Sequence, residues 1–247
     1  MKIELSNLDQ FNNIKHAIST VSDGNMSFLY GNKKEVLENR KKFLEKNNLS
    51  LDNCLTMRLQ HGDKIEVVDV SSSGRGMYEL ESAPEADCLI TKEVGLGLFL
   101  IIADCLPVII YDPENGTLAL VHLGWRSTNT KLIQKTIRKM VNNFNSDPKN
   151  LMVFIGPGIH KESYKSKKAP QSKLPGWKNF THKDPDGLTS VDLYGYNFQQ
   201  ALDMGVLKDN IFISNIDTFS SKELFSHRRS EVKSEPEGRF AVVVCLK

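Results

Sequence analysis

The longest apolar stretch, residues 96–111, is interrupted by a single charged side chain, Asp104. A turn follows at residues 112–116, and a second apolar segment covers residues 117–122. Uninterrupted apolar runs predict strands covered on both faces, and the Asp-Pro-Glu-Asn-Gly turn predicts a hairpin between them. A chain with such a hairpin must place further layers of structure on both sides of its central sheet.

The periodicity of apolar residues predicts the other elements. Helical spacing predicts helices over 33–47, 130–144 and 191–204, with Asp192 as the N-cap of the third. Strands are expected at 55–60, 65–70, 88–91, 97–103, 108–111, 117–122, 151–155, 211–213 and 240–246, with one or two more within 1–22. Residues 71–76 and 165–188 are predicted to be loops, and we expect the second to be partly disordered. This order predicts an α+β fold in a single domain over residues 1–247.

Composition excludes several classes of protein. Apolar residues make up 40% of the 247-residue chain and the net charge is +2, which fits a globular protein and gives no sign of nucleic-acid binding. The four cysteines form no CxxC pair, so a disulfide scaffold is not expected. No stretch reaches the roughly 18–20 apolar residues of a membrane span, and no signal peptide is visible. We expect a cytoplasmic protein without a membrane partner and leave its oligomeric state open.

Three side chains that can bind metals stand where predicted strands end. Asp104 and Cys105 break the apolar run, with Pro107 two residues further on, so the backbone changes direction here. His122 ends the returning strand of the hairpin, which brings it towards Cys105. His61 ends another strand and is followed by Gly62.

Two imidazoles and one thiolate suit zinc and would leave a fourth position open, as in catalytic zinc sites. Zinc in such a site would supply hydroxide at neutral pH. Spacing alone leaves the alternative that Cys105 is an inert core residue and that the histidines are merely hydrogen-bonded.

Five short motifs occur in order along the chain. They are Leu59-Gln60-His61-Gly62, Ala103-Asp104-Cys105-Leu106-Pro107-Val108, His122-Leu123-Gly124-Trp125-Arg126, Ile155-Gly156-Pro157-Gly158-Ile159 and Phe225-Ser226-His227-Arg228-Arg229. Together they resemble the laccase-domain family, also described as purine nucleoside phosphorylase-like and including peptidoglycan editing factors. The resemblance covers the chain from about residue 16 to its end.

The resemblance implies mixed β-sheets layered between helices, with zinc rather than copper on His61, Cys105 and His122. It implies small-molecule substrates: phosphorolysis of adenosine, inosine and methylthioadenosine with phosphate, or deamination of adenosine. Cys105, His122 and Asp104 would be catalytic, with Asp104 orienting a ligand or moving a proton. Arg126, Arg228 and Arg229 would bind the substrate, since guanidinium groups match phosphate.

The sequence departs from the family pattern around these motifs. Val21 replaces an arginine that is a candidate phosphate ligand, and His227 stands where a tyrosine is usual. Three alternatives stay open. Cys105 could be the nucleophile of an amidase acting on cell-wall precursors, with His122 as its base and His61 orienting that base. The chain could instead be a copper-dependent phenol oxidase, or a divergent relative without activity.

Overall fold

The computed structural model describes residue 8 and residues 10–247. Its α-helices are α1 (Lys33–Lys46), α2 (Trp125–Asn129), α3 (Leu132–Phe144), α4 (Leu193–Asp203) and α5 (His227–Lys233). Its strands are β1 (Ile14–Ile18), β2 (Cys54–Thr56), β3 (Ile65–Val67), β4 (Cys88–Thr91), β5 (Gly97–Ile102), β6 (Leu106–Asp112), β7 (Thr117–Leu123), β8 (Met152–Ile155), β9 (Lys165–Ser166), β10 (Thr181–Lys183), β11 (Thr189–Val191), β12 (Ile211–Ile213) and β13 (Phe240–Leu246). Short 3-10 helices lie at Val21–Asp23, Val70–Ser72, Pro170–Lys173 and Lys208–Asn210.

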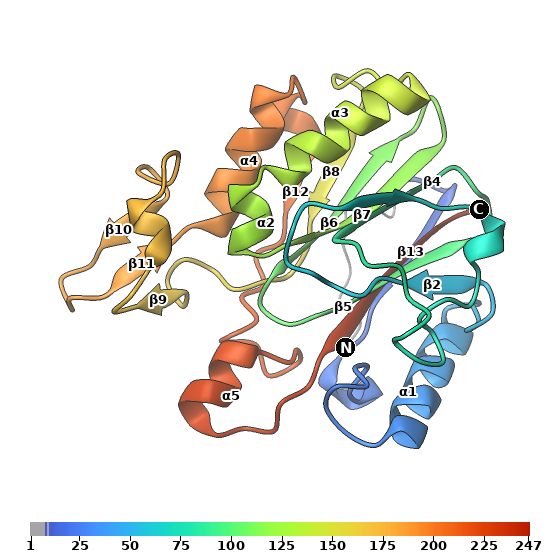
Figure 1. The fold of residues 1–247 in the computed structure, drawn as a ribbon, viewed down its shortest axis with the longest axis horizontal. Helices are drawn as coiled ribbons and strands as arrows, with labels where there is room; N and C mark the ends of the chain where they lie inside the picture. Colours follow the sequence, from blue (N-terminus) through green and yellow to red (C-terminus); the bar gives the residue numbers. More distant parts are fainter. Residues whose placement is uncertain (1–7, 9) are drawn as a thin grey trace.

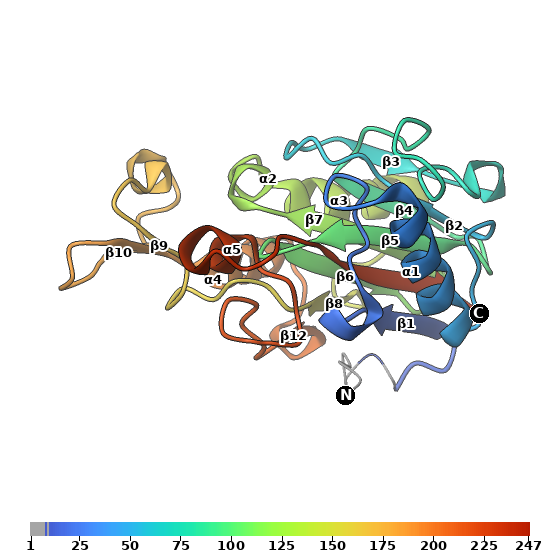
Figure 2. The same cartoon turned by 90° about the horizontal axis from the view of Figure 1, so that it is seen from below.

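Two mixed sheets form the body of the molecule (Figures 1 and 2). One has the strand order β12-β8-β6-β7-β4-β3, and the other has the order β1-β13-β5-β2. Apolar side chains from both sheets form a core between them. A second core joins the six-stranded sheet to α3 and α4, and a third joins the four-stranded sheet to α1. The layers therefore run helices, sheet, sheet, helix, which confirms the predicted α+β fold with mixed sheets between helices.

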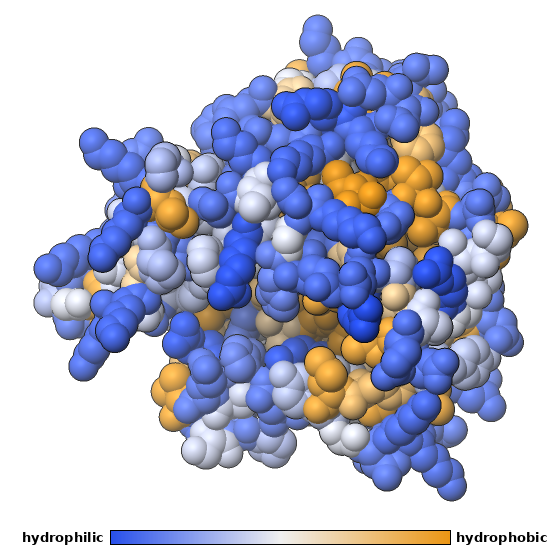
Figure 3. Space-filling view, viewed as in Figure 1, coloured by the Kyte–Doolittle hydropathy of each residue, from blue (hydrophilic) through white to orange (hydrophobic). Residues whose placement is uncertain are grey.

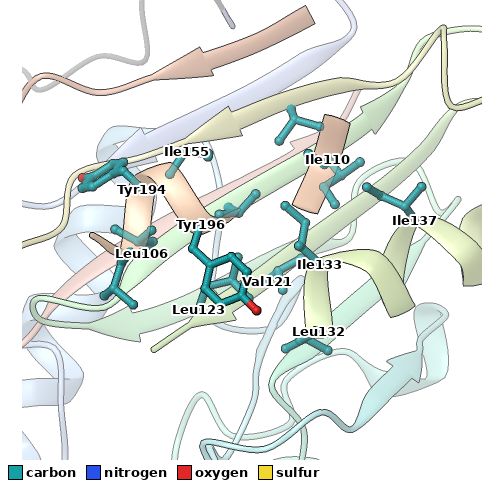
Figure 4. Packing of buried hydrophobic residues seen from close by; sticks show 14 of the residues in the cluster. Leu106, Ile110, Val121, Leu123, Leu132, Ile133, Ile137, Ile155, Tyr194 and Tyr196 are labelled. Carbon is teal, nitrogen blue, oxygen red and sulfur yellow. The ribbon is translucent and has the colours of Figure 1, made fainter. Parts of the chain in front are cut away.

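Strand β6 shows why the apolar runs are continuous. Leu106 and Ile110 point into the core shared with the helices (Figure 4), whereas Ile109 and Tyr111 point into the core between the sheets. Successive side chains of a strand face opposite ways, so a strand buried on both faces is apolar at every position. Every residue of β6 and β7 is buried.

The structure confirms the three predicted helices and the hairpin, with small shifts at the ends of elements. Asp192 caps α4 as predicted, since its Oδ1 accepts a hydrogen bond from the Gly195 amide at 2.7 Å. The expected strands at 55–60 and 65–70 are shorter in the structure. Helices α2 and α5 are not predicted from the sequence, because each spans only about one or two turns. Strand β1 lies within the segment 1–22, of which residues 1–7 and 9 lie outside the described residues. Within the described part of the chain, no helix has the length and apolarity that a membrane crossing demands.

Residues 165–188, predicted to be a loop, contain two short strands and a 3-10 helix. Strands β9, β10 and β11 form a small antiparallel sheet in a lobe beside the body (Figure 1). Trp177 anchors this lobe: its side chain is fully buried, its indole donates to Asn129 Oδ1 at 3.0 Å, and its ring contacts Tyr196. The surface of the lobe is mostly hydrophilic (Figure 3), which is why its composition resembles that of a disordered segment. One buried aromatic residue therefore anchors a segment whose lysine-rich composition is typical of a loop.

Candidate metal centre

His61, Cys105 and His122 come together at the strand ends. Their candidate ligand atoms, one from each side chain, all lie within 4.8 Å of one another, and the two imidazole rings meet edge to face at 4.9 Å. Cys105 follows the end of β5 and precedes β6, while His122 lies near the end of β7 opposite Pro107. The hairpin therefore brings Cys105 and His122 together as predicted, and the loop after β2 adds His61.

The backbone at this site takes unusual conformations. His61 and Asp104 both have positive φ, at 55° and 71°. Such angles are uncommon outside glycine and often mark functional positions. Gly124 lies against the cluster, and a Cβ added there would stand 3.0 Å from Cys105 Sγ and 3.8 Å from both histidine rings. A side chain at this position would crowd all three candidate ligands.

Asp87 supports the cluster from behind, and sequence reasoning missed it. This fully buried carboxylate lies 2.9 Å from His122 Nδ1 and accepts hydrogen bonds from the amides of His61 and Gly62. A carboxylate on the far nitrogen of a histidine fixes the ring and its tautomer, as is usual behind metal ligands. It also shows that Asp87, and not His61, orients His122. The tripeptide Ala-Asp-Cys at 86–88, repeated at 103–105, was the available signal.

The pKa shifts fit a cluster prepared to bind a cation. Burial and the nearby His122 lower the pKa of His61, which favours the neutral imidazole, whose unprotonated nitrogen can bind a metal. Burial alone would lower the pKa of His122, but its interactions with Cys105 and Asp87 raise it to about 9. Burial would raise the pKa of Asp87, whereas hydrogen bonds from His122 and the Gly62 amide hold it below its usual range. The Asp87 carboxylate therefore lies directly against the ring of His122.

Asp104 lies beside Cys105 but is engaged with the chain itself. Its Oδ1 accepts from the Thr218 hydroxyl at 2.6 Å, and its Oδ2 accepts from the Arg228 amide at 2.7 Å. The second bond ties Asp104 to the first turn of α5. These contacts are those of a positioning residue, and its catalytic role stays a prediction.

The three predicted substrate-binding arginines separate into two groups. Arg126 and Arg228 line the cavity beside the cluster, and Arg126 stacks over Trp125 at 4.7 Å. Arg229 does not: it is buried, its guanidinium donates to the carbonyls of Thr218, Ser221 and Leu224, and it pairs with Glu235. Its two terminal nitrogens hold the chain that precedes α5 and its Nε holds Glu235 beyond the helix, so Arg229 is not placed to bind substrate.

Two adjoining cavities open onto the cluster, and we call them the apolar chamber and the polar chamber. The apolar chamber, about 390 Å³, is lined by Phe28, Leu29, Tyr30, Met57, Leu59, Leu80 and Ile101 together with Arg40, Arg58 and Arg239. The polar chamber, about 400 Å³, is lined by Arg126, Arg228, Asp104 and Glu231 together with Trp125 and Tyr164. Both chambers share His61, Ala103, Cys105 and His227. The candidate metal centre therefore stands where the two chambers meet.

The layered fold, with its site at the ends of strands, now allows comparison with known proteins. Residues 16–247 match the family model described as multi-copper polyphenol oxidoreductase laccase. The chain belongs to this enzyme family.

Related sequences and structures cover most of the chain. The chain is 26% identical over 246 residues to a purine nucleoside phosphorylase of Bacteroides thetaiotaomicron, covering 92% of this chain and 90% of the relative. It is 30% identical over 207 residues to the purine nucleoside phosphorylase YlmD of Geobacillus stearothermophilus, covering 79% and 74%. The crystal structure of that YlmD superposes with a TM-score of 0.86 at 26% identity, covering 96% of this chain and 93% of the other. The hypothetical protein YfiH of Bacillus licheniformis shares the fold, with a TM-score of 0.87 at 23% identity, covering 97% and 95%.

Proposed function

We propose that this protein is a zinc-dependent purine nucleoside enzyme that phosphorolyses adenosine, inosine or methylthioadenosine, or deaminates adenosine. The observation that carries the proposal is the position of His61, Cys105 and His122 at the junction of an apolar and a polar chamber. A purine nucleoside has a flat apolar base and a polar sugar, so it suits such a junction. The two relatives are named purine nucleoside phosphorylases, which supports phosphorolysis.

The three side chains suit zinc by the chemistry of their donor atoms. Two nitrogens and one sulfur within 4.8 Å leave a fourth position open, which is the arrangement of catalytic zinc sites. When bound, zinc would supply a Lewis acid that activates water or polarises an oxygen atom of the substrate. Asp87 would keep His122 in the orientation that presents its free nitrogen to the ion.

The chambers suggest how a nucleoside and phosphate would lie. The aromatic and aliphatic side chains of the apolar chamber would contact the base, with Phe28 and Tyr30 among them. Arg126 and Arg228 in the polar chamber would hold phosphate, since their planar guanidinium groups match its oxygens. This assignment provides two cations although the family arginine is replaced by Val21, which does not line either chamber.

The test compares wild type, Cys105→Ala and the control Cys88→Ala by elemental analysis and by assays on adenosine, inosine and methylthioadenosine with and without phosphate. We expect about one zinc per chain in wild type and in Cys88→Ala, and loss of both zinc and product in Cys105→Ala. Product that depends on phosphate identifies phosphorolysis, whereas inosine formed from adenosine without phosphate identifies deamination. Absence of metal in the wild type would refute the proposal.

A cysteine hydrolase is the second candidate, and one observation favours it. Cys105, His122 and Asp87 stand in the order of nucleophile, base and orienting carboxylate, and the thiolate and carboxylate raise the pKa of His122 to about 9. Removal of metal separates the two functions. A chelator should abolish nucleoside turnover by the zinc enzyme, whereas a cysteine hydrolase should cleave amides without metal.

Oxidation of phenols by copper has less support. Within the described residues, one group of three side chains could hold a metal, and a multicopper cluster requires additional ligands.

A further inference from the structure

His227 is the first residue of α5 and lines both chambers. It shares this position with His61, Ala103 and Cys105, so it borders the space in which a substrate would meet the candidate metal centre. Its side chain is about half exposed, at 48%. Asp104 holds helix α5 in place, because its side chain accepts a hydrogen bond from the Arg228 amide.

A carboxylate fixes the imidazole of His227. Its Nδ1 lies 2.6 Å from Glu237 Oε1, and the same oxygen accepts a hydrogen bond from Arg239 at 2.9 Å. Arg239 in turn donates to the Tyr30 hydroxyl at 2.9 Å and lies over the Tyr30 ring. Glu231, on the same helix, stands 3.6 Å from Nε2. A histidine whose Nδ1–H is held by a carboxylate presents Nε2 for proton exchange.

Five other groups around the chambers are less suited to donating a proton near neutral pH. His61, Cys105 and His122 would be occupied by the metal. Both oxygens of Asp104 accept hydrogen bonds. Burial, with the Cys105 thiolate adding to it, raises the pKa of Tyr164 to about 12.

We propose that His227 is the acid that protonates the departing purine base at this site, with Glu237 as its positioning residue. The proposal rests on the proposed nucleoside phosphorolysis. A phosphate oxygen would bond to C1′ of the ribose while the bond from C1′ to N9 breaks and its electron pair passes into the purine ring. The proton on His227 Nε2 would move to N7 of the purine, and the products are ribose 1-phosphate and the neutral base. Solvent at the half-exposed ring would then return the proton.

The test compares inosine with 7-methylinosine, each with phosphate, in wild type and His227→Gln. The methyl group already places positive charge on the base at N7, so this base leaves without taking a proton. We expect His227→Gln to lose about 100-fold or more in kcat on inosine and less than about threefold on 7-methylinosine. Glu237→Gln should show a smaller loss on inosine and again little on 7-methylinosine.

His182→Gln, an exposed histidine of strand β10 outside both chambers, is the matched control and should behave as wild type. Equal losses on both nucleosides would show that His227 only shapes the site, and unchanged activity would show that it has no role, so either result overturns the inference. A wild type that cleaves neither nucleoside refutes the phosphorolysis itself. Zinc content measured on each variant confirms that the metal centre is intact.

Discussion

The tripeptide Ala-Asp-Cys occurs twice, and its two copies have opposite roles. In the first copy Asp87 supports His122 and Cys88 is fully buried in the core, where the Thr136 hydroxyl contacts its sulfur at 3.4 Å. In the second copy Asp104 holds α5, and Cys105 is partly exposed in the candidate metal centre. The aspartate of the first copy and the cysteine of the second copy therefore belong to the candidate metal centre.

Backbone conformation explains the difference. Cys88 begins strand β4 and its side chain points into the core beneath the helices. Asp104 adopts a left-handed conformation, with φ of 71°, between the end of β5 and the start of β6. This turn directs the Cys105 side chain to the edge of the sheet. The two cysteines therefore have different surroundings, because Cys88 lies within a strand and Cys105 lies in the turn that precedes one.

The largest expected difference is in thiol reactivity. Burial raises the pKa of Cys88 to about 12, so at pH 8 only about one thiol in 10⁴ is ionised. In chelator-treated protein, iodoacetamide should modify Cys105 rapidly and leave Cys88 unmodified while the chain stays folded. Mass spectrometry of the peptides measures both rates, and added zinc should protect Cys105. Similar rates for the two cysteines would contradict the comparison.

Asp104→Ala should destabilise the protein by about 2–4 kcal/mol, because alanine loses two charge-assisted hydrogen bonds and tolerates positive φ poorly. Asp104→Asn is the matched control. Asparagine accepts left-handed angles and keeps one acceptor oxygen, so it should cost about 1 kcal/mol. Urea denaturation followed by circular dichroism, with chelator present, gives both values. Equal stability of the two variants would show that the conformation of Asp104 is unimportant.

Asp87→Asn should weaken zinc binding by about 10- to 100-fold, since it removes the charge behind His122. Asp104→Asn changes the other copy of the tripeptide and should alter the affinity much less, because Asp104 contacts α5 and Thr218. Competition with a chromophoric chelator measures both affinities. An equal loss in the two variants would mean that Asp87 has no special connection to the metal.

The sequence predicts some of the contacts in this site and not others. The apolar runs and the interruption at Asp104 predicted the hairpin, and with it the meeting of Cys105 and His122. The repeated tripeptide marks Asp87 in the sequence, but it could not place Asp87 behind His122, because β4 and β7 become neighbours only through pairing of distant strands. Nor could it reveal that the Arg229 guanidinium donates hydrogen bonds to backbone carbonyl groups. Those facts depend on side-chain directions, which periodicity does not contain.

The smallest expected effect is on the pH dependence of stability, and it tests which partner raises the pKa of His122. Without metal that pKa is about 9, above the roughly 6.5 of an unfolded chain, so the stabilisation is complete below pH 6.5 and is lost as pH rises through 9. Metal-free protein should therefore lose about 1–2 kcal/mol between these pH values. Zinc-loaded protein should show the opposite slope, because the ion competes with protons for the same groups. Cys88→Ala should leave both slopes unchanged, since the Cys88 thiol stays protonated throughout, whereas Cys105→Ala should flatten both.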